Sequence, residues 1–275
     1  MKISVLLENT AISPDVQCEH GLSLHIETEG RTILFDTGAS DLFCANAVRM
    51  GIHLAAVDLV VLSHGHCDHS GGLAAFLACN DLAPVYVSRH AFGDYCVKKE
   101  NGETHFIGVD PALVGSGRMR YVDDRLDLDE NTLLFSGVGG DYPRPSGNSR
   151  LLMGIDGHHL PDDFRHEQNL ILTTRGGKRI LFAGCAHSGM VNILDHSRRL
   201  CGAYPDLVVG GLHLIDRGTS SEDFAELDAL AQQLLQSGAM FYTCHCTGLS
   251  AYERLRQTMG DRITYFAAGA ELTVE

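Results

Sequence analysis

Three histidines and an aspartate, namely His64, His66, Asp68 and His69, lie within six residues of one another. Imidazole and carboxylate groups at this spacing are typical metal ligands, and they suit zinc, manganese or iron. Because a loop points alternate side chains in two directions, His64 and His66 could hold one ion while Asp68 and His69 hold a second. Two ions about 3.5–4 Å apart can share a water molecule, lower its pKa and hold a substrate oxygen. We therefore expect two divalent metal ions here, with zinc as the first choice and manganese or iron as open alternatives.

The same cluster could instead be a histidine-rich loop exposed to solvent. Against this alternative, it follows directly after the apolar run 58–63, which predicts a buried β-strand. Further apolar runs at 32–35, 179–184, 207–211 and 239–243 also end in possible ligands or catalytic groups, namely Asp36, Cys185 and His187, His213, and His245. Open α/β sheets carry their sites at the carboxyl ends of the strands. The pattern therefore predicts one site assembled from several strand ends.

The remaining chain predicts the elements that cover these strands. Helices are expected over 219–237, with Thr219 and Glu222 as a capping box and Gly238 as the stop, over about 250–259 with Ser250 and Glu253 at its start, and over 70–78. The stretch at about 90–166 is rich in Gly, Asp and Arg, and we expect an irregular insertion that forms a lid or substrate wall. The alternative that stays open is an insertion without a function.

Composition restricts the partners and the compartment. The 275 residues include 35 acidic and 21 basic side chains, a formal charge of −14, which would repel nucleic acid. A small anionic substrate stays possible, because bound metal ions can reverse the local field. No apolar run is long enough for a membrane span, and the segment 1–7 reads as a first strand rather than a signal peptide. Nine cysteines without a framework spacing predict free thiols in the cytoplasm.

The motif His-x-His-x-Asp-His at 64–69 resembles the signature of the metallo-β-lactamase superfamily, and residues 34–38 resemble its upstream strand and turn. The resemblance implies an α/β protein, an αβ/βα four-layer sandwich with two metals at the edges of its sheets. Residues 1–275 would then form a single domain of the metallo-β-lactamase fold. His66 stands where flavodiiron proteins carry Glu, which argues against that redox branch.

Further motifs narrow the resemblance. They lie at residues 8–10, 19–23, 184–189, 191–193, 210–213 and 245–248. Together they resemble a subfamily named for 7,8-dihydropterin-6-methyl-4-(β-D-ribofuranosyl)aminobenzene 5′-phosphate synthase, over nearly the whole chain from Glu8 to Gly248. The resemblance implies the joining of a pterin methyl carbon to an arylamine, with release of diphosphate.

One departure from the wider superfamily affects the ligand set. Where many relatives carry a bridging Asp, this chain has Cys185, followed two residues later by His187. We therefore expect His187 to bind the first metal and His245 the second. Cys185 is either a bridging thiolate or an ordinary buried cysteine, and both interpretations stay open. A structural zinc site at Cys244 and Cys246 is disfavoured, because four ligands at CxxC-like spacing are missing.

Other residues are assigned around this centre. Asp68 and His213 are expected to act in catalysis, and substrate binding is expected from Asn9, His20, His213 and Arg144, whose guanidinium suits planar anions. The interpretation of these residues as ordinary surface or strand-end groups stays open. Five further histidines are expected at the surface: His105, His158, His159, His166 and His196. Glu167 and Gln168 could hold residues of the site in place, and the sequence leaves this role open.

Three functions fit these residues. The leading hypothesis is a dinuclear-metal enzyme that acts on an anionic small molecule, in the manner of the synthase named above. The alternative is a hydrolase of a phosphodiester, ester or lactone that uses a metal-bridging hydroxide. A third is a metal-loaded binding or sensing protein without turnover. The sequence leaves open whether the chain forms a homodimer.

Overall fold

A computed structural model describes residues 1–215, 217–218 and 220–275. Within these residues two large sheets lie face to face. The first has the strand order β18-β1-β2-β3-β4-β5-β8, with the bounds β18 Glu271–Thr273, β1 Lys2–Leu7, β2 Ser23–Glu27, β3 Thr32–Phe35, β4 Leu59–Val61, β5 Val85–Ser88 and β8 Met119–Val122. The second has the order β17-β16-β15-β14-β13-β10-β9, with the bounds β17 Ile263–Tyr265, β16 Met240–Thr243, β15 Leu207–Gly210, β14 Arg179–Ala183, β13 Asn169–Thr173, β10 Thr132–Phe135 and β9 Arg125–Asp129.

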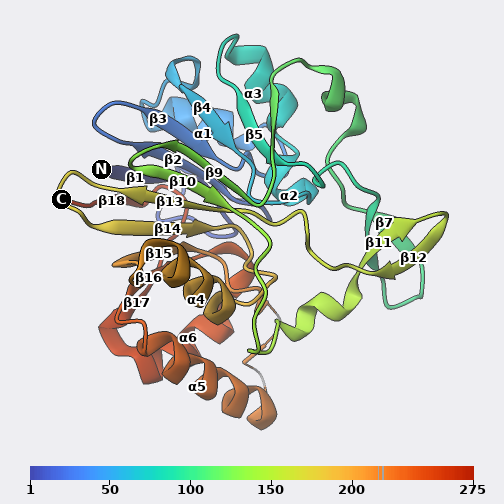
Figure 1. The fold of residues 1–275 in the computed structure, drawn as a ribbon, viewed down its shortest axis with the longest axis vertical. Helices are drawn as coiled ribbons and strands as arrows, with labels where there is room; N and C mark the ends of the chain where they lie inside the picture. The colour runs from blue at the N-terminus through green and yellow to red at the C-terminus, as the bar shows by residue number, and fades with distance from the viewer. Residues whose placement is uncertain (216, 219) are drawn as a thin grey trace.

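Helices cover the outer faces of both sheets. Figure 1 shows helices on the outer side of each sheet. Those of the first sheet are α1 Leu42–Arg49 and α3 Leu73–Cys79, and those of the second are α4 Met190–Cys201, α5 Ser221–Leu235 and α6 Leu249–Met259. The short helix α2 Cys67–Ser70 lies at the end of the sheets, directly after β4. The layers are helix, sheet, sheet, helix, so the predicted αβ/βα sandwich is confirmed.

Three apolar clusters separate the four layers. One fills the space between the sheets, where the rings of Phe35 and Phe182 lie 6.0 Å apart. The other two join each sheet to its own helices. Strands β3, β4 and β14 have an apolar cluster on each face, and they are buried at every position except the first residue of β3 and of β14. This burial explains why they appear as apolar runs in the sequence. All five strands predicted from these runs are present, as β3, β4, β14, β15 and β16.

The segment at about 90–166 is more regular than its composition indicates. It adds β8 to the first sheet and β9 and β10 to the second, and it forms a third sheet of order β12-β11-β6-β7. These strands are β12 His158–Pro161, β11 Leu151–Ile155, β6 Tyr95–Lys98 and β7 Thr104–Phe106. Figure 1 shows this third sheet standing away from the sandwich, on the side where α2 lies. Its role as a lid or substrate wall stays a prediction.

The helix starts differ from the sequence predictions. Helix α5 begins behind Ser220, whose hydroxyl accepts from the Asp223 N–H at 3.1 Å, while the Asp223 carboxylate accepts from the Ser220 N–H at 3.1 Å. This capping box replaces the predicted pair of Thr219 and Glu222; Thr219 lies outside the described residues. Helix α6 begins at Leu249 behind Gly248, so the prediction of Ser250 and Glu253 at its cap is wrong. The predicted helix 70–78 is divided into α2 and α3, with Gly71 and Gly72 between them.

The Ser220 cap gives a first testable prediction. Ser220→Ala removes an acceptor for one of the free N–H groups at the start of α5, so the free energy of unfolding should fall by about 1 kcal/mol. Urea unfolding followed by circular dichroism measures this change. Ser221→Ala, one residue later on an exposed position, is the matched control. Equal losses in the two variants would contradict a capping role for Ser220.

No helix among the described residues combines the length and the apolar character that crossing a bilayer requires.

Candidate metal centre

The predicted ligands meet at the carboxyl ends of strands from both sheets. The His64–His69 segment follows β4 of the first sheet, whereas His187 and His245 follow β14 and β16 of the second. Three turns at these strand ends place a residue other than glycine in the left-handed region: Ala186 at φ 55°, His213 at φ 51° and His245 at φ 50°. Such backbone is strained for side chains with a Cβ and concentrates at functional sites.

The first cluster joins His64, His66 and His187. The Nε2 atoms of His64 and His187 are 3.3 Å apart. Ligand atoms of His64 and His187 also lie within 4.8 Å of the Cys185 sulfur, and those of His64 and His66 within 4.8 Å of Asp68. All three imidazoles are buried. The structure thus brings together the histidines predicted for the first metal.

The second cluster joins Asp68, His69, Cys185 and His245, whose ligand atoms all lie within 4.8 Å of one another. The Nε2 atoms of His69 and His245 are 3.2 Å apart, and the His245 Nε2 is 3.2 Å from the Asp68 carboxylate. The Cys185 sulfur is 3.2 Å from the His69 Nε2. The Cys185 sulfur lies within 4.8 Å of ligand atoms in both clusters, and its role as a bridging thiolate stays a prediction.

These clusters pass a test of their fit to metal ions. The Nδ1 atom of His187 faces the Asn148 Oδ1 at 2.9 Å, that of His69 faces the Asp36 carboxylate at 2.6 Å, and that of His245 faces the Asn9 Oδ1 at 2.8 Å. When Nδ1 donates a hydrogen bond, the Nε2 of the same ring carries a lone pair. Two such Nε2 atoms 3.2–3.3 Å apart repel each other unless a cation lies nearby. Burial, helped by neighbouring imidazoles, lowers the pKa of His64 and His187 well below the usual value, so a proton does not fill this role between these two rings. In the second cluster burial lowers the pKa of His69, but Asp36 and Asp68 together raise it to about 9. The donor set fits divalent ions.

Three buried carboxylates accept hydrogen bonds from the strand ends and rings of the predicted ligands. Asp36 accepts from the Ser63 N–H at 2.7 Å and also holds His69. Glu8 accepts from the His245 N–H at 3.0 Å, and Glu167 accepts from the His187 N–H at 2.5 Å. The structure therefore gives Glu167 the supporting position that the sequence left undecided. Burial raises the pKa of Glu167, against the effect of the N–H groups that it accepts from.

His213 and Cys246 border the first cluster. The His213 ring centroid is 4.3 Å from that of His187, and ligand atoms of His213, Cys185 and Cys246 lie within 4.8 Å of one another. Among the described residues the His213 Nδ1 has no hydrogen-bond partner. This position is next to the metal ligands, as the predicted substrate or catalytic role requires.

The other predicted substrate residues lie at different depths. His20 places its Nε2 3.3 Å from the Asp68 carboxylate, and with 57% of its side chain exposed it reaches the mouth of the centre. Hydrogen bonding to Asp68 raises the pKa of His20. Asn9 is occupied behind the ligand His245, so its contact with a substrate stays a prediction. Arg144 lies outside both clusters, on an exposed loop, and donates to the Asp163 carbonyl at 3.3 Å.

One surface prediction is wrong. His166 is fully buried, because its Nδ1 accepts from the Gly65 N–H at 3.0 Å and its Nε2 faces the Asp162 carboxylate at 3.0 Å. The same carboxylate oxygen lies 3.8 Å from the Nε2 of His66. His105, His158 and His159 are exposed as predicted, whereas His196 is half-buried and stacks on Phe135 with ring centroids 5.4 Å apart.

Asp162 thus connects the insertion to a ligand, and this contact gives a second prediction. Its side chain is fully buried between His66 and His166, and the two imidazoles hold its pKa well below the usual range although burial raises it. Asp162→Asn should weaken zinc binding about 10–100-fold, the usual effect of losing an outer-sphere partner of a ligand histidine. Competition with a fluorescent zinc chelator measures the affinity. Asp163→Asn, which alters the exposed neighbour paired with Arg165, should change it little, and an equal effect of both variants would contradict the prediction.

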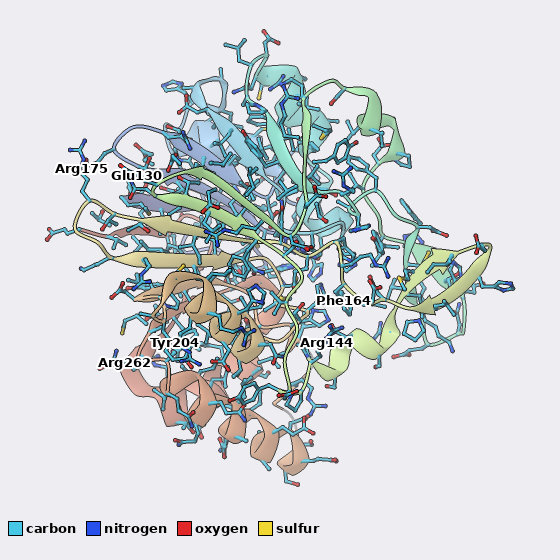
Figure 2. All side chains as sticks on the ribbon, viewed as in Figure 1. Glu130, Arg144, Phe164, Arg175, Tyr204 and Arg262 are labelled. Carbon is cyan, nitrogen blue, oxygen red and sulfur yellow. The ribbon has the colours of Figure 1, made fainter. Side chains whose placement is uncertain are left out.

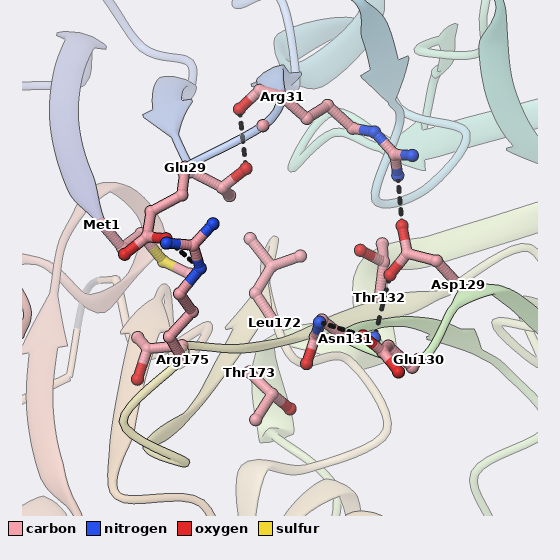
Figure 3. A pocket seen from close by; sticks show the side chains of 13 residues that line it. Met1, Glu29, Arg31, Asp129, Glu130, Asn131, Thr132, Leu172, Thr173 and Arg175 are labelled. Atoms are coloured by element: carbon pink, nitrogen blue, oxygen red, sulfur yellow. Dashed lines mark hydrogen bonds and ion pairs between the residues drawn. The ribbon is translucent and has the colours of Figure 1, made fainter.

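Two cavities lie at different places relative to the candidate metal centre. The larger, of about 390 Å³, is bordered by the ion pairs Arg31–Asp129 and Arg175–Glu29 (Figure 3). Figure 2 shows Arg175 and Glu130 of this cavity at the left edge of the molecule, whereas Phe164, whose ring stacks on that of His187, lies right of the centre. The other, of about 370 Å³, is lined by Gly189, Leu212 and Leu214, which are close in sequence to His187 and His213.

Comparisons with known proteins agree with this geometry. Residues 17–234 match the family model described as the metallo-beta-lactamase superfamily. The chain is 28% identical over 259 residues to the uncharacterized protein MJ0448 of Methanocaldococcus jannaschii, covering 93% of this chain and 94% of that protein. It is 26% identical over 271 residues to the 7,8-dihydropterin-6-methyl-4-(beta-D-ribofuranosyl)-aminobenzene-5'-phosphate synthase of the same organism, covering 91% and 89%.

Among solved structures, Tm1679, described as a metal-dependent hydrolase of the beta-lactamase superfamily, has a TM-score of 0.83 and 26% identity, covering 100% of this chain and 99% of that one. YhfI from Bacillus subtilis, described as a metallo-beta-lactamase fold protein, has a TM-score of 0.56 at 13% identity, covering 98% of both chains, and supports the fold alone.

Proposed function

Because this chain belongs to the metallo-β-lactamase superfamily, whose fold binds divalent metal ions, we propose that it is a dinuclear-metal enzyme acting on a small anionic molecule. The observation that supports this most is the pair of adjoining clusters, each with ligand atoms within 4.8 Å of the Cys185 sulfur. One ion would be held by His64, His66 and His187, and the other by the remaining ligands Asp68, His69 and His245. When bound, the ions supply Lewis acidity, which polarises a substrate oxygen and lowers the pKa of a water molecule. We propose zinc, because thiolate and imidazole donors suit it, with manganese or iron as alternatives.

The residues around the clusters have separate tasks in this proposal. Asn9, Asn148 and Asp36 hold the ligand rings in one orientation through their Nδ1 atoms. His20 and His213 border the ligands without belonging to either predicted set, and are placed to contact a substrate. The acidic surface of the chain favours a small molecule over nucleic acid as the partner.

For the reaction we propose transfer of a pterin methyl carbon to an arylamine with release of diphosphate. The support is the near full-length similarity to the synthase of Methanocaldococcus jannaschii. Hydrolysis of a phosphodiester, ester or lactone is the second candidate, supported by the similarity to Tm1679, which is described as a hydrolase.

One experiment separates these reactions. Zinc-loaded protein is incubated with a pterin methyl diphosphate, with an arylamine ribofuranosyl phosphate, and with both, and the products are followed by mass spectrometry. A joined product that requires both substrates supports transfer, whereas release of diphosphate from the pterin alone supports hydrolysis. Protein treated with a chelator is the control. If His66→Ala and Asp68→Ala leave the cellular function intact, metal catalysis is excluded and a binding or sensing role takes its place.

A further inference from the structure

The cavity of about 370 Å³ has the composition of a binding site for a small organic molecule. It lies between the loop 143–146, the start of α4 and one face of α5. Its apolar wall consists of Met190, Val191, Leu212, Leu214, Leu227 and Leu230. Mainly apolar cavities of about 300–1,000 Å³ with a few polar groups are typical of such sites.

The segments that line this cavity also carry residues of the candidate metal centre. Leu212 and Leu214 flank His213 in sequence, and Gly189 follows the ligand His187 by two residues. The loop that lines the cavity continues into Gly147, where a Cβ would lie 3.1 Å from the His213 Nε2. The next residue, Asn148, holds the His187 ring at 2.9 Å. A molecule in the cavity would therefore contact the segments that carry His187 and His213.

Two arginines line the cavity, and they differ in their partners. Arg217 is paired with Asp223 at 2.7 Å and with Glu226, so its charge is neutralised. Arg144 donates to a backbone carbonyl, that of Asp163, and among the described residues it forms no ion pair with a carboxylate. A guanidinium with free donors suits the oxygens of a phosphate or carboxylate. Figure 2 shows Arg144 on the same side of the molecule as Phe164, which stacks on His187.

We propose that this cavity binds the apolar body of the substrate and that Arg144 binds an anionic group attached to it. The substrate is then an organic phosphate or carboxylate with a flat aromatic or aliphatic body, rather than an inorganic anion or a free sugar. The proposal rests on the proposed function in one respect only, namely that the ligand is also the substrate.

The test is calorimetric titration of the zinc-loaded full-length chain with 1-naphthylmethylphosphonate, which has no ester bond to break. The phosphonate should bind about tenfold or more tightly than either inorganic phosphate or 1-naphthol. Arg144→Gln should weaken phosphonate binding about tenfold or more, since a charge-assisted pair is lost, and leave inorganic phosphate bound to the metals unchanged. Titration with 1-naphthoate shows whether Arg144 favours phosphate or carboxylate oxygens.

Two further variants keep the test decisive. Leu230→Gln changes the apolar wall and should weaken the phosphonate and 1-naphthol alike, without changing inorganic phosphate. Arg150→Gln removes an exposed arginine further along the same loop, outside the cavity lining, and should change nothing. Unaltered phosphonate binding in Arg144→Gln, or equal losses in Arg144→Gln and Arg150→Gln, would overturn the proposal. Because the readout is binding, a chain that shows the expected affinities without turnover would contradict the proposed function and not this site.

Discussion

Replacing Asp68 with alanine is expected to reduce the metal content from two zinc ions per chain to one and to lower turnover at least about 100-fold. Among the described residues Asp68 is the carboxylate of the second cluster, 3.2 Å from the His245 Nε2 and 3.8 Å from the His69 Nε2. Burial raises its pKa, but His69, His20 and His245 together hold the pKa well below the usual range, so the group is an anion. Loss of a direct ligand should exceed the roughly 10–100-fold effect of losing an outer-sphere partner.

Elemental analysis after dialysis against zinc-free buffer measures the metal content, and the assay of the pterin and arylamine substrates measures turnover. Cys67→Ala, at the exposed neighbouring position, should retain both ions. Two ions retained in Asp68→Ala would show that this carboxylate is no metal ligand, and the dinuclear assignment would then need another donor.

Replacing Asp36 with alanine should lower the free energy of unfolding by about 3–5 kcal/mol, the typical effect of removing one partner from a buried charged pair. The carboxylate is fully buried and accepts from the Ser63 N–H at 2.7 Å, the Ser63 hydroxyl at 2.7 Å and the His69 imidazole at 2.6 Å. Without it three buried donors lose the acceptor that they share. The backbone at Asp36 also has φ 62°, a conformation that Asp and Asn adopt more readily than alanine.

Urea unfolding in the presence of a chelator measures this loss without a contribution from bound metal. Asp36→Asn keeps an acceptor and tolerates the backbone, so it should lose less than Asp36→Ala and separate the effect of charge from that of shape. Asp41→Ala, an exposed carboxylate at the start of α1 that makes no capping hydrogen bond, is the control. A loss below about 1 kcal/mol in Asp36→Ala would contradict the role assigned to Asp36.

The sequence predicts the strands of the two large sheets well, because a buried strand requires apolar residues at nearly every position. Strands such as β14, enclosed by an apolar layer on each side, must be apolar at nearly every position, and a ligand residue after such a run is easily noticed. The meeting of His64 with His187 follows from the same logic, since both residues follow the carboxyl end of a strand, β4 in one sheet and β14 in the sheet that faces it. The length and position of the strands therefore carry most of the information about the site.

The supporting residues could not be predicted in this way. Asn148 and Asp162 belong to the segment 90–166, and their contacts with His187 and His66 join residues that are far apart in the chain. No local pattern encodes such a contact. The prediction of His166 at the surface is wrong for a similar reason. Its partner Asp162 lies only four residues away, but its other partner, the Gly65 N–H, comes from a distant part of the chain. Glu8 offered one usable signal, an acid directly after a buried strand.

The distribution of the ligands along the chain determines when the centre can be completed. His64 to His69 are made early, whereas His187 and His245 follow much later, and β18, which pairs with β1, ends only at Thr273. At about 5–20 residues per second, a ribosome needs on the order of ten seconds or more to travel from the first ligands to the last. During that interval the nascent chain offers an unfinished set of donors. Under the proposed function, completion of both sets of ligands is thus a late event of biogenesis, because it requires His245.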